Sequence, residues 1–473
     1  MFAPIYRLYV LFVALFGVLV FATSWWTVFG AESLRENTAN RRPLLEQARI
    51  KRGLIKAADG TVLARSVQRA DDTWTRRYPQ GTLLSHVVGY SFLRYGQAGV
   101  ERSRNEALTG ERDEITSVFD QLTGERKVGD DVITTLDPDA QRTAIDALGG
   151  QKGSVVALDP DSGAVRVMAS YPQFDPNDIP RTLGRLNRDP DSPLLNRATQ
   201  GRYAPGSTFK VVTAAAALDT GRFKPDSVVD GSSPKEISGV PLFNSGGASF
   251  GSITLTEALT QSVNTVWAQV GETLGKRTMA RYMQRFGFYN RPPLDYPAGQ
   301  RFASGEFFEG ELLSPTSDRI DVGRMAIGQD KLQVTPLQMA MVAAAVAGDG
   351  TIARPHLTDR VVDPDGRVRD DIGRTTFSRV MKRDTAATMR EMMSNVVREG
   401  TGTAAALSGI QVAGKTGTAE RGDGTNQVWF IGLAPVEDPQ VAIAVTVERT
   451  DGQGGTVAAP IAKQVLEKLI GNQ

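Results

Sequence analysis

One long apolar stretch lies near the N-terminus, and only short apolar stretches follow it. Residues 8–29 carry no charged side chain and match the roughly 20 residues that a helix needs to cross a bilayer. Trp25 and Trp26 lie near its end, and tryptophan is typical of the lipid–water interface. A cleaved signal peptide is the alternative, but its apolar region usually spans only about 7 to 15 residues. We therefore predict a retained membrane-spanning helix over residues 8–29, preceded by a cytoplasmic tail at residues 1–7.

A small module is expected between this helix and the rest of the chain, over residues 30–135. Apolar runs flank the turn dipeptide Asp59-Gly60, a pattern that is typical of a β-hairpin. We interpret this part of the chain as a small mixed α/β module.

The remaining residues, 136–473, have strand patterns at both ends and helix patterns between them. The predicted strands are short apolar runs, at 154–158, 164–168, 410–413, 428–433 and 441–447. The predicted helices end near glycine or the C-terminus, at 211–220, 264–274, 336–347 and 459–470. Strands at both ends with helices between them predict one α+β domain whose sheet is assembled from distant segments.

Charge and composition exclude several classes of protein. The 54 lysine and arginine residues nearly cancel the 53 aspartate and glutamate residues, so no global field would attract nucleic acid. Cysteine is absent, which excludes disulfides, thiolate catalysis and cysteine-based zinc sites. The two histidines, His86 and His356, lie far apart in the sequence and are interpreted as surface or packing residues. We therefore expect no metal site and no cofactor.

A candidate nucleophile and a candidate base occur together at the start of an alanine-rich helix. Ser207 and Lys210 are three residues apart, so their side chains share one helical face. A serine hydroxyl needs a neighbouring base, and lysine can act as one when desolvation and nearby positive charge lower its pKa. The same spacing recurs at Ser232 and Lys235, although the proline between them disfavours a helix. Spacing alone is therefore weak evidence.

A second polar pair, Ser262 and Asn264, lies between two predicted helices. A loop between helices can present both side chains to a cleft. An ordinary helix cap is the alternative, and Ser103 with Asn105 shows how easily the spacing arises.

A third element lies on a probable strand and consists of Lys415, Thr416, Gly417 and Thr418. The lysine supplies positive charge, the threonines supply hydroxyl donors, and the glycine permits close approach of a ligand to the backbone. This combination suits a peptide substrate that carries a carboxylate. The joint order of the three elements makes the signal much stronger than any one of them.

In this order the three elements resemble the motifs of the penicillin-binding protein and serine β-lactamase superfamily. The chain most closely resembles class B penicillin-binding proteins, over nearly everything after the apolar stretch. The matching segments include 52–64, 99–101, 108–110, 134–138, 175–177, 196–198, 328–329, 334–338 and 429–432. Within class B, the short module at residues 30–135 is most similar to that of the actinobacterial penicillin-binding proteins A.

The resemblance implies both a fold and a set of catalytic roles. The fold would be an antiparallel sheet of about five strands flanked by helices, with an all-helical part and a non-catalytic pedestal- or dimerisation-like module. Ser207 would attack the penultimate D-Ala carbonyl of a stem peptide, with Lys210 as the proton acceptor. Ser262 would relay a proton toward the leaving amine, and Asn264 would hold Lys210 and the substrate backbone.

The strand motif has implied roles as well. Lys415 would keep the site electropositive and help to keep Lys210 neutral. Thr416 and Thr418 would receive the terminal carboxylate of the substrate, beside Gly417. The backbone amides of Ser207 and Thr418 would form the oxyanion hole.

The activity implied by the resemblance is cross-linking of peptidoglycan stem peptides during growth or division. A pentapeptide would be the donor, an amine of a neighbouring stem the acceptor, β-lactams covalent inhibitors, and a polytopic membrane glycosyltransferase a partner. A D,D-carboxypeptidase, a β-lactamase and a non-catalytic penicillin-binding scaffold are the alternatives. The catalytic domain would lie outside the plasma membrane, although the arginines flanking the apolar stretch favour the opposite orientation by number.

A rival motif, Gly247-Ala248-Ser249-Phe250-Gly251, matches the nucleophile elbow of α/β hydrolases, with His356 downstream as a possible base. That elbow needs a strand immediately before the serine and a helix immediately after it. The preceding residues are typical of a loop and the next predicted helix begins only near Thr254, so we do not favour this site.

Overall fold

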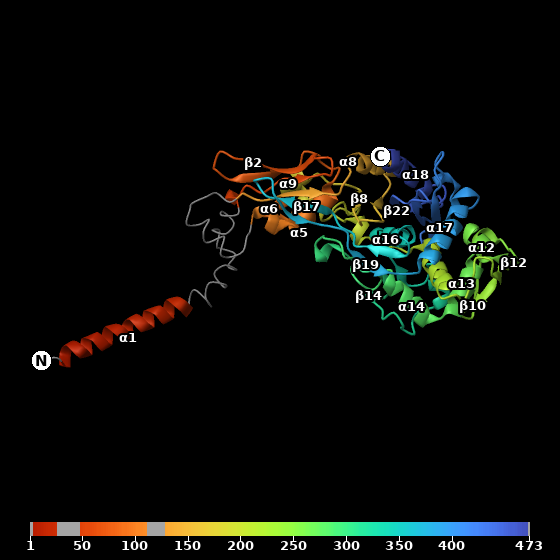
Figure 1. The fold of residues 1–473 in the computed structure, drawn as a ribbon, viewed down its shortest axis with the longest axis horizontal. Coiled ribbons are helices and arrows are strands. Elements are labelled where there is room, and N and C mark those ends of the chain that lie inside the picture. The colour runs from red at the N-terminus through yellow and green to blue at the C-terminus, as the bar shows by residue number, and fades with distance from the viewer. Residues whose placement is uncertain (1–2, 26–47, 111–127, 472–473) are drawn as a thin grey trace.

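The computed structural model describes residues 3–25, 48–110 and 128–471. Helix α1 (Ala3–Trp25) contains an apolar stretch, Ile5–Thr23, that is long enough to cross a membrane (Figure 1). The helix begins at Ala3 and not at residue 8, because Ile5 and Tyr6 extend its apolar surface toward the N-terminus. Most of the tail expected at residues 1–7 is therefore helical, and residues 26–29 of the predicted span lie outside the described residues.

The large domain is built around an antiparallel five-stranded sheet with the order β20-β21-β22-β7-β8. Its strands are β7 (Gly153–Leu158), β8 (Val165–Tyr171), β20 (Ala413–Glu420), β21 (Asn426–Ala434) and β22 (Val441–Thr450). The pairing of β22 with β7 joins the two ends of the domain, so the predicted α+β sheet is confirmed (Figure 1). The strand expected at 410–413 begins only at Ala413, because the chain bends at residues 408–410.

Helices cover both faces of this sheet, which explains why its strands are almost continuously apolar. α16 (Pro336–Ala347), in which every residue is buried, packs on one face. α8 (Pro138–Leu148) and α18 (Ala458–Gly471) pack on the other face. Side chains of one strand alternate between the two cores, with Val156 in the α16 cluster and Val155 in the α18 cluster.

A helical part lies beside the sheet and carries much of the site described below. It comprises α11 (Lys210–Asp219), α12 (Leu255–Thr260), α13 (Asn264–Leu274), α14 (Lys276–Arg285) and α17 (Arg383–Arg398). The predicted helix bounds agree with α11, α13, α16 and α18 to within one residue. α12 begins with a capping box, in which Thr254 and Glu257 exchange side-chain and backbone hydrogen bonds.

The N-terminal module contains a six-stranded sheet with the order β18-β17-β6-β1-β2-β3. Its strands are β1 (Ile55–Lys56), β2 (Val62–Gln68), β3 (Trp74–Arg77), β6 (Asp131–Thr134), β17 (Thr358–Val362) and β18 (Val368–Asp371). Ile55 lies opposite Ala64, so the hairpin predicted around Asp59-Gly60 is confirmed. β17 pairs with β6, so a division of the chain at residue 135 cuts across one continuous sheet.

A buried carboxylate, Glu101, joins the strands of the module to its helices. Glu101 lies on α5 (Gly99–Ser103) and is fully buried. Arg76 Nε donates to it at 2.5 Å and Arg52 Nη2 at 2.9 Å. Burial raises the pKa of Glu101, but the two guanidinium groups outweigh burial and hold that pKa below its usual value.

We expect a Glu101→Gln substitution to lower the free energy of unfolding by about 3 to 5 kcal/mol, because the buried guanidinium of Arg76 and the partly buried one of Arg52 lose their counter-charge. Urea unfolding followed by circular dichroism measures the change. Glu106→Gln, at an exposed position on the adjacent α6 (Asn105–Thr109), is the control and should change stability by less than about 0.5 kcal/mol. Equal stabilities for the Glu101→Gln variant and the parent would contradict this account of the module.

Candidate active site

Ser207 lies on a single 3₁₀ turn, Gly206–Phe209, that continues directly into α11. Gly206 has φ 51°, a backbone conformation that glycine adopts easily and other residues do not. A Cβ atom at Gly206 would lie 2.9 Å from the carbonyl oxygen of Thr418. The glycine therefore lets the loop before Ser207 pack against strand β20.

Lys210 follows one turn later and is fully buried, which is rare for a lysine. Its Nζ lies 2.7 Å from the carbonyl oxygen of Ser262 and 2.7 Å from Oδ1 of Asn264, with Ser262 Oγ at 3.3 Å. A neutral amine has two N–H donors and one lone pair. The two short contacts take both donors, so the lone pair is left to accept a hydroxyl proton.

The electrostatics of the site favour this neutral form. Burial, and after it the neighbouring Lys415, lowers the pKa of Lys210 well below its ordinary value. Lys415 is also fully buried, and burial lowers its pKa to about 7. Among the residues that the structure describes, no carboxylate lies within 4.0 Å of either amine, so neither lysine is stabilised as an ion pair. Lys210 is thus suited to act as a base near neutral pH.

Ser262 lies between the two lysines. Its Oγ is 2.9 Å from Nζ of Lys415 and 3.3 Å from Nζ of Lys210. Its φ of 60° is unusual for a residue other than glycine, and such strain persists where the surroundings fix the conformation. The hydroxyl is therefore placed to pass a proton between the base and the cleft.

The helix-cap interpretation of Ser262 and Asn264 is wrong. The N-cap of α13 is Val263, and no side chain caps this helix. Asn264 Oδ1 accepts from Lys210, and its Nδ2 donates to the carbonyl oxygen of Phe243 at 3.0 Å. The asparagine therefore holds the amine of Lys210 and also anchors the loop at residue 243.

Strand β20 forms the opposite wall and lies at one edge of the sheet. A Cβ atom at Gly417 would lie 2.7 Å from the carbonyl oxygen of Pro205, so the group that approaches this glycine closely is the nucleophile loop. Thr416 Oγ1 shares a hydrogen bond of 2.6 Å with Thr401 Oγ1. Thr418 Oγ1 accepts from the amide of Gly454 at 3.1 Å, which leaves its O–H free to donate to a ligand.

The structure adds residues that sequence reasoning missed around the nucleophile loop. Trp429 Nε1 donates to the carbonyl oxygen of Ala204 at 2.9 Å. The Tyr203 hydroxyl donates to Glu448 Oε1 at 2.6 Å, and Arg197 Nε reaches the same oxygen at 2.9 Å. Burial, and after it Glu448, raises the pKa of Tyr203, so this hydroxyl stays protonated. Arg197 and Trp429 lie in segments 196–198 and 429–432, which resemble the family, so the sequence offered a signal for them. The sequence around Glu448 offered no such signal.

The rival sites do not assemble. Lys235 Nζ bonds Asp230 at 2.6 Å on an exposed hairpin, so it is not placed as a base. Ser249 lies in an exposed loop after a short 3₁₀ turn and not on a nucleophile elbow. His86 and His356 are both buried, so they are packing residues and not surface residues. Within the described ranges, no three histidine, aspartate or glutamate side chains gather in a way that could hold a metal ion.

Comparison with known families gives two matches along the chain. Residues 153–467 match the penicillin binding protein transpeptidase domain, and residues 52–132 match the penicillin binding protein A dimerisation domain. The peptidoglycan D,D-transpeptidase PbpA of Mycolicibacterium smegmatis is 35% identical over 93% of both chains. The protein of that name from Mycobacterium tuberculosis is 33% identical over 99% of both chains.

Solved structures with the same arrangement are also similar. The ceftriaxone acyl-enzyme complex of penicillin-binding protein A from M. tuberculosis superposes with a TM-score of 0.82 at 33% identity, and the match covers 90% of this chain and all of that one. The D,D-transpeptidase domain of a peptidoglycan glycosyltransferase from Eggerthella lenta gives a TM-score of 0.79 at 37% identity, with coverage of 90% and 99%.

Proposed function

The chain belongs to the penicillin-binding protein transpeptidase family, and from this premise we propose that Ser207 is the nucleophile of a peptidoglycan D,D-transpeptidase. The observation that carries the proposal is the buried Lys210, which shares Ser262 with a second buried lysine, Lys415. Two buried lysines without a carboxylate partner are costly to keep charged, and a base that must be neutral explains the arrangement.

The first half of the reaction forms an ester on Ser207. Its Oγ attacks the penultimate D-Ala carbonyl of a stem pentapeptide while Lys210 takes the hydroxyl proton. The C–N bond to the terminal D-Ala then breaks, and the leaving amine receives a proton by way of Ser262. A β-lactam follows the same course, except that its ring opens and the amine stays attached to the acyl group.

The second half transfers the acyl group. An amine on a neighbouring stem peptide attacks the ester, its proton is accepted by the same network, and Ser207 leaves as the free hydroxyl. The backbone amides of Ser207 and Thr418 would hold the oxyanion in both halves. Removing one such donor typically costs about 3 to 4 kcal/mol of transition-state stabilisation.

The strand motif supports binding of the donor's terminal carboxylate. Lys415 supplies the positive charge, and the free hydroxyl proton of Thr418 can be donated to the carboxylate. Thr416, which is hydrogen-bonded to Thr401, adds a second hydroxyl at the same place. One amide hydrogen of Asn264 bonds Phe243, so the other would hold the substrate backbone.

The lysine pair predicts a bell-shaped pH dependence for the second-order rate constant of β-lactam acylation. The rate rises with pH as Lys210 loses its proton, and it falls near pH 7 as Lys415 loses its charge. A bound carboxylate favours charged Lys415, so the falling limb should move to higher pH in the rate constant at saturation. Stopped-flow acylation between pH 5 and 9 measures both constants.

A Lys415→Ala variant is the control for this prediction. It should lose the falling limb, and its rising limb should move to higher pH because Lys210 no longer faces a neighbouring positive charge. A flat profile in the parent protein would show that neither lysine titrates in the reaction.

We extend the proposal to the placement of the protein at the membrane. The N-terminus would lie in the cytoplasm, α1 would be a single-pass anchor, and residues 136–473 with the module at residues 30–135 would face the cell wall. The apolar span Ile5–Thr23 supports an anchor, and the wall polymer that the enzyme cross-links lies outside the membrane. Cross-linking acts on glycan strands that a polymerase must supply, so we propose a polytopic membrane glycosyltransferase as a partner.

A partition experiment tests the transpeptidase against the carboxypeptidase and β-lactamase alternatives. The full-length chain in detergent is supplied with a pentapeptide donor and an amine acceptor, and mass spectrometry compares the transfer product with the hydrolysed tetrapeptide. Transfer that increases with acceptor concentration supports the proposal. Hydrolysis alone at every acceptor concentration would overturn it in favour of a carboxypeptidase.

A further inference from the structure

The N-terminal module contains a cavity of about 660 Å³ that is separate from the Ser207 site. It lies between strand β3 and the β-hairpin formed by β4 (Ser91–Phe92) and β5 (Gly96–Gln97), beside helices α5 and α6. Its volume is in the range of small-ligand sites.

The lining of this cavity is strongly and unevenly charged. Five arginines line it and no aspartate or glutamate does, within the part of the chain that the structure describes: Arg52, Arg69, Arg76, Arg94 and Arg102. The last two are exposed and have no carboxylate within 4.0 Å among the described residues. Like charges around one cavity repel one another, and an anion in the cavity relieves that repulsion.

Two of the arginines are fixed in place from behind. Arg52 and Arg76 both bond the buried Glu101, so their side chains are held in one geometry before any ligand arrives. Arg76 is only 4% exposed, and its Nη2 has neither a hydrogen-bond partner among the described residues nor accessible surface. Arg76 would therefore act on an anion through its charge and not through a direct hydrogen bond from this atom.

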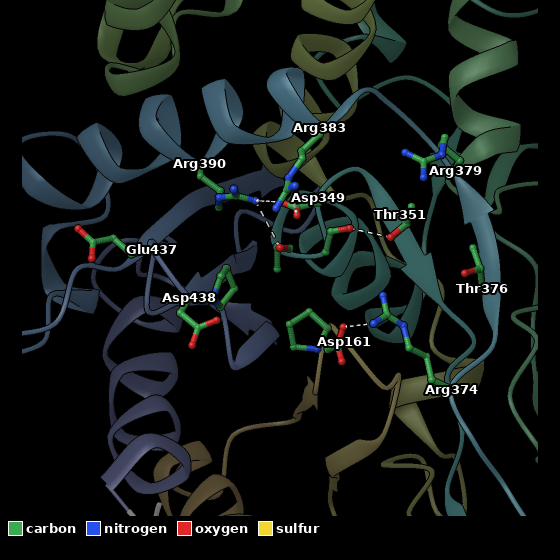
Figure 2. Close-up of a pocket in the computed structure, with 14 residues that line it drawn as sticks. Asp161, Asp349, Thr351, Arg374, Thr376, Arg379, Arg383, Arg390, Glu437 and Asp438 are labelled. Carbon is green, nitrogen blue, oxygen red and sulfur yellow. Dashed lines mark hydrogen bonds and ion pairs between the residues drawn. The ribbon is translucent and has the colours of Figure 1, made fainter.

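A second arginine-lined cavity shows that clustering of arginines alone is not unusual in this protein. Figure 2 shows this cavity, where Asp349 pairs with Arg383 and Arg390, and Asp161 pairs with Arg374. Two more carboxylates, on the loop between β21 and β22, also line it. Its charges are therefore balanced from within, whereas in the module cavity one carboxylate, Glu101, pairs with only two of the five arginines.

The uncharged residues that line the module cavity indicate which other groups a ligand there would carry. Trp74, Phe92 and Tyr95 line it, and Tyr95 is 36% exposed. Serine and threonine hydroxyls and the amides of Gln97 and Asn105 also line the cavity. Aromatic faces beside many neutral hydrogen-bonding groups suit a compact ring that carries hydroxyl and amide substituents.

From this combination we propose that the module binds an anionic saccharide, an acidic or phosphorylated amino sugar. Arg94 and Arg102 bind the anionic group, with Arg76 behind them, and the aromatic side chains pack against the sugar ring. The site is distinct from the cleft at Ser207 and does not depend on the acylation chemistry.

Calorimetric titration of the full-length chain in detergent tests the proposal with three probes. N-acetylglucosamine 1-phosphate carries both the ring and the anion, N-acetylglucosamine lacks the anion, and inorganic phosphate lacks the ring. We expect the sugar phosphate to bind at least about tenfold more tightly than either of the others, because charge-assisted hydrogen bonds and ring contacts add. Prior treatment with a β-lactam, which occupies the Ser207 cleft, should leave this binding unchanged.

Two variants make the result specific to the cavity. Arg94→Gln combined with Arg102→Gln should weaken sugar phosphate binding at least about tenfold, with an unchanged melting temperature because both residues are exposed. Arg367→Gln, at an exposed turn between β17 and β18, should have no effect. Equal affinities for phosphate and sugar phosphate, or no effect of the double variant, would overturn the proposal. A double variant that changes only the sedimentation mass would instead identify the cavity as an interface between copies of the chain.

Discussion

A Ser207→Ala variant is expected to form no covalent adduct with penicillin G and no cross-linked product, while it folds like the parent protein. The hydroxyl oxygen of Ser207 becomes the ester oxygen of the acyl-enzyme. Without it, the acyl group cannot be attached to the protein at this position. Loss of the nucleophile in comparable serine enzymes lowers the rate about a millionfold. Intact-mass measurement after incubation with penicillin G, beside the parent protein, detects the adduct directly.

Two other serines provide matched controls for this experiment. Ser232 has the same spacing to a lysine as Ser207, and Ser249 lies in the rival hydrolase-like motif. Ser232 donates to Asp230, a poor base because the hydrogen bond from Lys235 lowers its pKa, and among the described residues Ser249 only accepts from a backbone amide. The Ser232→Ala and Ser249→Ala variants should therefore label at the parental rate. If the Ser207→Ala protein still formed an adduct, another residue would be the nucleophile. The proposed mechanism would then be wrong.

The candidate residues of the site could be predicted from the sequence because each motif is local. Ser207 and Lys210 depend on helical spacing alone, and Lys415 to Thr418 depend on one strand. Their meeting could be expected only from the order of the motifs and the family resemblance. The structure brings Lys210, Ser262 and Lys415 within hydrogen-bonding distance of one another through Ser262.

Contacts between distant segments could not be predicted in this way. Thr401 lies 15 residues before its partner Thr416, and Glu448 lies 245 residues after Tyr203. Neither has a local pattern, because their roles arise from the packing of β20 and β22 against the nucleophile loop. The part of β17 and β18 in the sheet of the N-terminal module was missed for the same reason, since both strands come much later in the chain than β6.

The two buried lysines have different proposed roles, so mutations at the two positions should have different effects. Lys415 contributes charge, so its loss should lower the rate by weakening carboxylate binding, and it should also raise the pKa of the base that remains. Lys210 contributes a lone pair, and among the described residues no other group is hydrogen-bonded to both Ser262 and Asn264. Loss of Lys210 should therefore reduce the rate at every pH.

We expect a Lys210→Met variant to be acylated about 10² to 10⁴ times more slowly than the parent, the range that a positioned general base contributes. Methionine fills a similar volume without an amine, so the buried site keeps its packing. Lys210→Arg keeps a positive charge but cannot lose its proton, so it should be equally slow if the lone pair matters. Stopped-flow acylation with penicillin G compares all three proteins. An active Lys210→Arg variant would show that the charge of Lys210, and not its basicity, drives acylation.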